Sequence, residues 1–222
     1  MKKYIDLIKN TKLFFGMTEG DIISMLGCLS ASKQEYKKGD YIYNAGDTVS
    51  KAAMVLEGIV HIERQDYWGN NSILSDVFPG ELFGEVHAIM NDEPVTVNAI
   101  AAKSGAVLML NMKKVFQTCT SMCPYHAKLI KNLIFVLASK DKELTDKMGY
   151  LSQRTIRDKL LTYLSDQSVR QGGAVFDISF NRQQLADFLA VDRSALSKEL
   201  SKLKNEGIIE FKKNHFELKE VR

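Results

Sequence analysis

The stretch Phe180–Gly207, FNRQQLADFLAVDRSALSKELSKLKNEG, constrains the chain most, because it predicts two short helices joined by a tight turn. Asn181 and Gln184 form a capping-box pattern at the start of the first helix, and Asp192 is placed to cap the second. Inside the second helix, leucines recur with the i, i+4, i+7 spacing of a buried face: Leu196, Leu200 and Leu203. We expect Gly207 to end this helix. The residues that follow it, IIEFKKNHFEL, predict a short hairpin.

The polar face of the second helix indicates what this pair of helices can bind. Near its N-terminus the helix carries Arg193, Ser194, Ser197 and Lys198. Such side chains on a protruding helix can reach base edges and phosphates in the major groove of DNA. The pattern is typical of a winged helix-turn-helix, and we expect Lys202 and Lys212 to add phosphate contacts. The alternative is two amphipathic helices in an ordinary core.

The charge of the chain is unevenly distributed. Its 222 residues carry a formal net charge of only +3. Residues 1–148 hold 17 Lys/Arg and 17 Asp/Glu, whereas residues 149–222 hold 13 and 10. All of the excess positive charge therefore lies in the part that contains the helix pair, which fits a nucleic-acid contact confined to one domain.

A membrane or secreted protein is disfavoured by the composition. No run of eighteen apolar residues occurs, and the first ten residues, MKKYIDLIKN, lack the apolar region of a signal peptide. We therefore expect a cytoplasmic protein with no membrane partner. The three cysteines, Cys28, Cys119 and Cys123, are odd in number and predict neither a disulfide framework nor a complete metal site. Redox sensing through Cys119 and Cys123 stays open as an alternative.

The region 1–112 predicts short helices followed by a β-rich domain. Apolar residues recur at helical spacing within residues 1–30. Between residues 32 and 112, turn signals separate short β-rich runs, most of them about ten residues apart: Gly39, Gly46, Gly58, Gly69, Gly80 and Gly84. Regular short strands of this kind predict an all-β sandwich or barrel.

The region 113–151 predicts a linker and a long helix that begins near Pro124, a residue suited to a first helical turn. Apolar residues follow one stripe of this helix, close to a coiled-coil seam, and we assign five of them to a dimer contact: Leu129, Leu133, Val136, Leu137 and Leu144. The alternative is a helix buried within one subunit. Residues 152–222 then form the winged helix-turn-helix domain, and we expect Ser152 to cap its first helix.

The order of these three parts resembles the Crp/Fnr family of bacterial transcription regulators. The matching motifs are Gly39-Asp40, Gly46-Asp47, Gly58-x-Val60, PGELFGEVHAI and VDRSALSKELSKLKNEGII. The resemblance implies an α+β fold: a cyclic-nucleotide-binding-like β-roll, a long dimerisation helix and a C-terminal winged helix-turn-helix. It also implies a homodimer that binds an inverted repeat in double-stranded DNA, with RNA polymerase as a candidate partner. Arg193, Ser194, Ser197 and Lys198 fall at DNA-contacting positions of the family, and Lys198 stands where Arg is common.

The effector is less well defined by the resemblance. Cyclic-nucleotide binders of the family hold the phosphate with an Arg-Ser pair, and this chain has Glu93-Pro94 there. A glutamate repels a phosphate and a proline lacks the N–H donor, so we do not expect cyclic AMP to bind. With Cys28 alone in the first thirty residues, we do not expect an iron–sulfur cluster either.

Haem-binding branches of the family place a histidine or similar ligand near the junction of roll and helix. We therefore assign these residues to an effector pocket: Gly84, Glu85, His87, Met90, His126 and Leu129. His87, His126 and Met90 are candidate haem ligands. Alternatively, the histidines are ordinary polar side chains and the roll binds another small molecule.

An enzyme is disfavoured because familiar catalytic motifs are missing. His61 is followed by Ile62-Glu63, without the second histidine that a cupin metal site needs, and no P-loop, zinc-protease or nucleophile-elbow motif occurs. The alternative to a DNA-binding regulator is a nucleotide- or ligand-binding module that acts through protein contacts.

Overall fold

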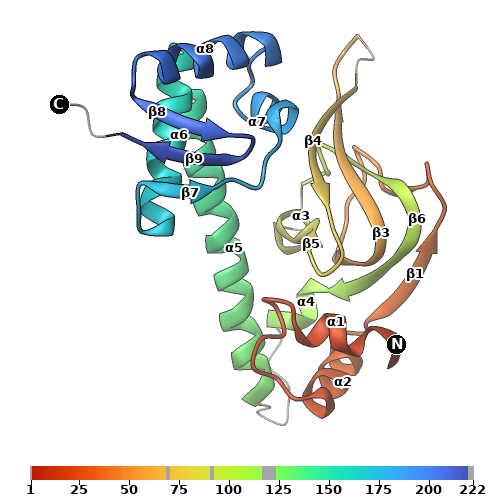
Figure 1. The fold of residues 1–222 in the computed structure, drawn as a ribbon. Coiled ribbons are helices and arrows are strands. Elements are labelled where there is room, and N and C mark those ends of the chain that lie inside the picture. Colours follow the sequence, from red (N-terminus) through yellow and green to blue (C-terminus); the bar gives the residue numbers. More distant parts are fainter. Residues whose placement is uncertain (1, 69–70, 91–92, 117–123, 220–222) are drawn as a thin grey trace. The chain divides into compact units, whose positions relative to one another are not determined.

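The computed structural model describes residues 2–68, 71–90, 93–116 and 124–219. Its contacts divide the chain into two compact units, Met1–Leu137 and Ala138–Arg222. The long helix α5 (Pro124–Leu151) runs without interruption from the first unit into the second (Figure 1). Within the described residues, no helix is both long and apolar enough to cross a bilayer.

The first unit opens with a 3-10 turn, Lys2–Tyr4, and two helices, α1 (Ile5–Lys9) and α2 (Glu19–Cys28). The helix α2 begins at a capping box in which Thr18 accepts the Asp21 backbone N–H and Asp21 accepts the Thr18 N–H. This pairing satisfies backbone donors that a helix N-terminus otherwise leaves without partners.

A six-stranded antiparallel sheet follows the helices. Its main order is β1-β6-β3-β4, with β2 paired to β6 and β5 paired to β3. The strands are β1 (Ser32–Tyr36), β2 (Tyr41–Tyr43), β3 (Lys51–Gln65), β4 (Asn71–Val77), β5 (Leu82–Phe83) and β6 (Asn98–Asn111). Two short helices accompany the sheet, α3 (Glu85–Met90) and α4 (Met112–Phe116). The predicted β domain is thus confirmed, although β6 is one long strand where the sequence pattern indicated two short runs.

Residues 52–56 of β3 and 106–110 of β6 are buried on both faces of the sheet, and alternate residues enter different cores. One core also contains residues of α1, α2 and the start of α5; from the two strands it takes Ala52, Met54, Leu56, Ala106, Leu108 and Leu110. The other core lies on the opposite face and takes Ala53, Val55, Val107 and Met109. The period-two pattern therefore fixes which face of the roll supports the helices.

Two glycines allow β3 and β6 to approach closely where their register shifts. The shifts lie between Val55 and Val60 on β3. A Cβ added to Gly105 would come within 2.0 Å of the Glu57 carbonyl oxygen, and Gly58 has φ +88 with the Lys103 carbonyl oxygen 2.8 Å from its Cβ position. Backbone atoms cannot give way as a side chain can, so both positions require glycine.

The second unit contains the end of α5 and a small domain with its own core. Its elements are α6 (Ile156–Gln171), β7 (Val175–Asp177), α7 (Arg182–Phe188), α8 (Arg193–Asn205), β8 (Ile209–Lys212) and β9 (His215–Leu218). The strands form an antiparallel sheet in the order β7-β9-β8. Its core includes aromatic residues from the sheet, Phe176 and Phe216, and leucines from α6, α7 and α8.

The predicted start of α6 was wrong. Thr155, not Ser152, caps this helix, because the Thr155 hydroxyl oxygen accepts the Asp158 backbone N–H at 3.0 Å. The helix α5 continues to Leu151, and the Ser152 hydroxyl donates to the Gly149 carbonyl oxygen. Both residues have the short oxygen-bearing side chain of a cap, so the choice between them depends on where α5 ends.

We predict that Gly105→Ala lowers the free energy of unfolding by ~2 kcal/mol or more, because a methyl group would collide with the β3 backbone. Gly27→Ala is the control: Gly27 lies in α2 with nothing within 4 Å of its Cβ position, and alanine should stabilise the helix by up to ~1 kcal/mol. Urea denaturation followed by circular dichroism measures both. Equal stabilities for the two variants would contradict the close approach.

Candidate nucleic-acid interface

The helix pair begins as the sequence predicted. The Asn181 side chain accepts the Gln184 backbone N–H at 3.0 Å, and the Asn181 N–H donates to the Gln184 side chain at 2.9 Å. The turn after α7 passes through Ala190, whose φ of 50 lies in the left-handed region. The Val191 N–H then donates to the carbonyl oxygen of Ala186, which is fully buried. Sequence reasoning predicted the turn but not the strained alanine.

The helix α8 presents one apolar and one polar face. Leu196, Leu200 and Leu203 are buried in the core of the second unit, as predicted. The six residues assigned to DNA contacts are all exposed: Arg193, Ser194, Ser197, Lys198, Lys202 and Lys212. Five of them lie on α8 and Lys212 ends β8.

A shallow hollow on the polar face of α8 adds three residues that sequence reasoning missed: Ser201, Asn205 and Glu206. It is lined by Ser197, Lys198, Ser201, Lys202, Asn205 and Glu206. Ser201 and Asn205 follow Ser197 at i+4 and i+8, so helical spacing from the predicted serine could have found them. The Ser201 hydroxyl donates to the Ser197 carbonyl oxygen at 3.0 Å.

The helix α8 is tied to the helix α6 by one arginine with two carboxylate partners. Arg157 Nη1 lies 3.3 Å from Glu199 Oε1, and Arg157 Nη2 lies 2.5 Å from Glu206 Oε2. The hydrogen bond to Glu206 is the main cause that raises the pKa of Arg157 and lowers that of Glu206. These side chains are partly exposed, so the bridges mainly orient α8 rather than stabilise the domain.

The hairpin β8–β9 is anchored from its inner side by Arg182 of α7. The guanidinium carbon lies 4.9 Å from the Phe211 ring centre and 5.2 Å from that of Phe216, and Nη2 donates to the Lys213 carbonyl oxygen at 2.6 Å. Burial lowers the pKa of Arg182, although an arginine stays charged. This contact holds the hairpin, and hence Lys212, beside the helix pair.

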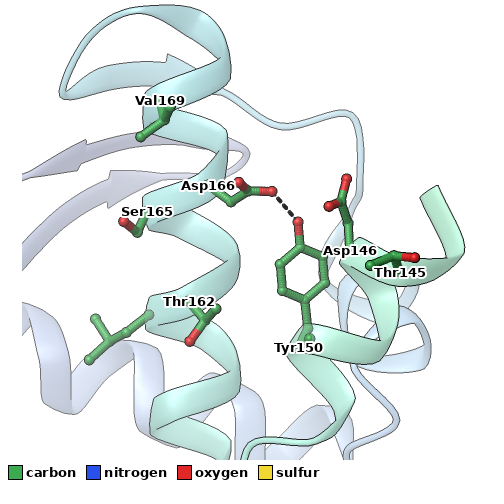
Figure 2. Close-up of a pocket in the computed structure, with 9 residues that line it drawn as sticks. Thr145, Asp146, Tyr150, Thr162, Ser165, Asp166 and Val169 are labelled. Carbon is green, nitrogen blue, oxygen red and sulfur yellow. Dashed lines mark hydrogen bonds between the residues drawn. The ribbon is translucent and has the colours of Figure 1, made fainter. Parts of the chain in front are cut away.

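A separate groove of about 600 Å³ lies between the end of α5 and α6, and its residues are drawn in Figure 2. The Tyr150 hydroxyl donates to Asp166, and Arg170 lies 2.9 Å from the same carboxylate and also pairs with Asp146. Burial, and then the bond to Asp166, raises the pKa of Tyr150, so its phenol stays protonated. The network joins the last turns of α5 to the helix-turn-helix unit, and sequence reasoning did not foresee it.

The first four effector residues lie at the end of β5 and on α3. Glu85 begins α3 and is only 3% exposed, while Met90 is half exposed and His87 partly buried. Gly84 has its Cβ position 2.6 Å from the Tyr43 ring, and burial together with the Glu85 carboxyl raises the pKa of Tyr43. The tyrosine ring thus occupies the space beside the predicted Gly-Glu motif.

The other two effector residues lie in the first turns of α5. His126 is 9% exposed, and its Nδ1 is buried with no hydrogen-bond partner in the part of the chain that the structure describes. Leu129 belongs to the core that also holds Ala88 of α3. The two elements that carry the predicted effector residues therefore share one core. Cys119 and Cys123 lie outside the described residues, and among the described ones no cluster of His, Cys, Asp or Glu fits a metal ion.

The predicted dimer residues differ in their surroundings. Leu129 and Leu133 are buried in the core of their own unit, Val136 is buried, Leu137 is partly buried and Leu144 is 63% exposed. Other apolar side chains of α5 are also exposed, namely Ile134 at 61% and Met148 at 70%. One face of the helix thus serves its own subunit, and a different face remains apolar and exposed.

Two protein families match this chain. The family described as Cyclic nucleotide-binding domain matches residues 33–121, and the Crp-like helix-turn-helix domain matches residues 158–222. The chain is 25% identical over 215 residues to the Cyclic AMP receptor protein of Thermus thermophilus, covering 96% of this chain and 95% of that protein. It is 22% identical to the Transcriptional activator protein FnrA of Stutzerimonas stutzeri, covering 78% and 71%.

Solved structures agree on the fold. The Catabolite Activator Protein of Thermus thermophilus aligns with a TM-score of 0.51 at 22% identity, covering 94% of each chain. The c-di-GMP responsive regulator CLP of Xanthomonas campestris aligns with a TM-score of 0.57 at 18% identity, covering 92% of this chain and all of that one. The two family matches and the matches to transcription regulators show that the chain belongs to the Crp/Fnr family of DNA-binding transcription regulators.

Proposed function

We propose that the protein is a homodimer that binds an inverted repeat in promoter DNA under control of a small effector. Residues 1–112 sense the effector, 113–151 link and dimerise, and 152–222 bind DNA. The single observation that carries the proposal is the polar face of α8, held outward by its buried leucines and by the Arg157 bridges. Two such helices related by a two-fold axis would meet half-sites about one helical turn, roughly 10 bp, apart.

Each contact residue has a distinct role in this proposal. Lys198 carries three donors at the centre of the exposed face and suits guanine or thymine acceptors, although it lacks the planar fork of an arginine. Arg193 lies at the first turn of α8 and is free to reach bases or phosphates. Lys202 and Lys212 meet phosphates, which adds affinity at any sequence.

The dimer contact is best placed on the side of α5 that its own subunit covers only in part: Ile130 and Leu137 also pack against the first core, whereas Ile134, Leu144 and Met148 are exposed. The apolar residues Ile130, Ile134, Leu137, Leu144, Met148 and Leu151 follow alternating steps of three, four or seven residues, as in a coiled-coil seam. This seam keeps Leu137 and Leu144 of the predicted set. It also leaves Leu129 and Leu133 to the core that they already occupy.

The effector is proposed to act where α3 and α5 share a core. A ligand that moved either element would shift the α5 pair and re-aim the two α8 helices. Glu93 and Pro94 are both exposed and stand where the family's phosphate-binding pair would lie, which supports an effector other than cyclic AMP. The Thermus relative is named a cyclic AMP receptor protein, but that name describes the relative and not this chain.

Haem is the effector to test first, because His126 offers a buried ring nitrogen that has no hydrogen-bond partner among the described residues. An unprotonated imidazole nitrogen is a common iron ligand. Haem bound there would supply an iron able to take up nitric oxide. His87 and Met90 are more exposed and fit this role less well.

Lys198→Ala should reduce the affinity for the specific DNA site by roughly tenfold or more, since each base contact is worth ~1–3 kcal/mol. The affinity for nonspecific DNA should stay nearly unchanged. Lys202→Ala should weaken binding to all DNA sequences. It should also lower by ~1 the magnitude of the slope that relates the logarithm of the DNA association constant to the logarithm of the salt concentration. Mobility shifts at several salt concentrations measure both. Lys37→Ala, an exposed lysine of the roll, is the control. Absence of salt-sensitive DNA affinity would instead favour a module that acts through protein contacts.

Leu144→Asp should convert the dimer to monomers, because a charge in an apolar seam lacks a partner there. Val169→Asp removes an exposed apolar side chain of α6 and should leave the dimer intact. Sedimentation equilibrium distinguishes the two masses, and circular dichroism checks folding. A dimer that survives Leu144→Asp would exclude this seam.

Calorimetric titration with cyclic AMP should give no binding heat, whereas haem added without air should give a stoichiometric Soret band. The band should disappear in His126→Ala and persist in His87→Ala, the control. Saturable binding of cyclic AMP would contradict the expectation that the β-roll binds a different effector. A spectrum without a sharp band would remove haem and leave the DNA-binding proposal unchanged.

A further inference from the structure

The first turn of α8 contains a serine whose hydroxyl hydrogen is already used. Ser194 Oγ donates to Asp192 Oδ1 at 2.5 Å, and the same Oδ1 accepts the Ala195 backbone N–H at 2.9 Å. Asp192 is the N-cap of α8, so its position is fixed by the helix itself. The distance is typical of a hydroxyl bound to a carboxylate.

The carboxylate determines the direction of this hydrogen bond. The bond from Ser194 is the main cause that lowers the pKa of Asp192, so the group is ionised near neutral pH and can only accept. A serine hydroxyl has one donor and two acceptor lone pairs. With its hydrogen held by Asp192, Ser194 therefore presents only acceptor capacity to a ligand.

This restriction matters because a free serine reads DNA ambiguously. An unrestrained hydroxyl can rotate to donate to guanine, to thymine O4 or to adenine N7, or to accept from the amino group of cytosine or adenine. Breaking its bond to a carboxylate in order to donate elsewhere would forfeit a charge-assisted hydrogen bond. The oriented serine thus has a preference that the residue type alone does not have.

We propose that Ser194 accepts a hydrogen bond from a base amino group, cytosine N4 or adenine N6, and that Asp192 is the residue that orients it. The assignment rests on the proposed DNA-binding function and defines the base class at one position of each half-site. Ser194 becomes a specificity-determining residue, and Asp192 acts through it without touching DNA.

The next turn of α8 has the opposite polarity. Lys198 offers donors only, and it lies four residues, or roughly 6 Å, along the helix axis from Ser194. A donor suits guanine N7 and O6 or thymine O4. Each half-site should therefore hold an amino-bearing base facing Ser194 and an acceptor base facing Lys198, within about two base-pair steps.

The test begins with selection of binding sites from random duplex DNA, using the full-length protein. The wild type should select cytosine or adenine at one position, and Ser194→Ala should lose the preference there alone. Asp192→Gly frees the hydroxyl while costing the helix cap only a few tenths of a kcal/mol. It should still contact the position but tolerate all four bases. Ser165→Ala, on α6, is the matched control and should select the wild-type motif.

A second measurement removes only the amino group. In the selected site, adenine is replaced by purine or cytosine by pyrimidin-2-one, the forms that lack N6 or N4. The wild type should lose about tenfold in affinity, the expected scale for one base contact. Ser194→Ala should show no further loss, as required if both changes remove the same bond.

The outcomes separate the two proposals. An unchanged motif in Ser194→Ala, or an equal loss with the analogue in both proteins, would overturn the role of Ser194 and leave DNA binding in place. A preference for guanine or thymine that Ser194→Ala abolishes would show that the serine donates, which also overturns the proposal. A wild type that selects no motif would overturn the proposed function and this inference together.

Discussion

The burial of three leucines on one side of α8 is the constraint on which the candidate interface depends. Leu196, Leu200 and Leu203 leave the helix only one orientation in its core, and the polar residues between them are then forced outward. Arg157 fixes that orientation further through the carboxylates of Glu199 on α8 and Glu206 at its C-cap. The positive charge of the domain alone would give affinity for DNA without sequence specificity. Specificity requires that a rigid element presents the cations in a fixed order.

The helix α5 illustrates how one element serves two environments. Leu129 and Leu133 join the core of the first unit, while Tyr150 at its other end joins that of the second. Between them the helix leaves Ile134 and Leu144 exposed. A helix with exposed apolar side chains beside its buried face can pack against a second helix as well as against its own subunit. We therefore place the dimer seam on the side of α5 that carries Ile134 and Leu144.

The sequence predicted some elements better than others, for local reasons. The capping box at Asn181 and the cap at Asp192 were visible, because each is decided by residues within four positions. The cap of α6 was misplaced at Ser152, since its choice depends on how far α5 extends. The stripe on α5 was recognised, but periodicity alone does not tell which of two apolar faces packs within the subunit.

The sequence by itself determined the order of the domains, the amphipathic α8 and its exposed polar residues, because these follow from short-range periodicity and side-chain chemistry. Only the tertiary structure decided the Tyr150–Asp166–Arg170 network, the burial of His126 Nδ1 with no hydrogen-bond partner among the described residues, and the close approach of β3 and β6 at Gly105. Each of these brings together groups from different elements or removes a group from water. The direction of the Ser194 hydroxyl is a local feature by contrast, because its partner Asp192 lies only two residues away. A residue name nevertheless specifies both a donor and an acceptor, and the geometry of the helix cap decides which of the two is left for a ligand.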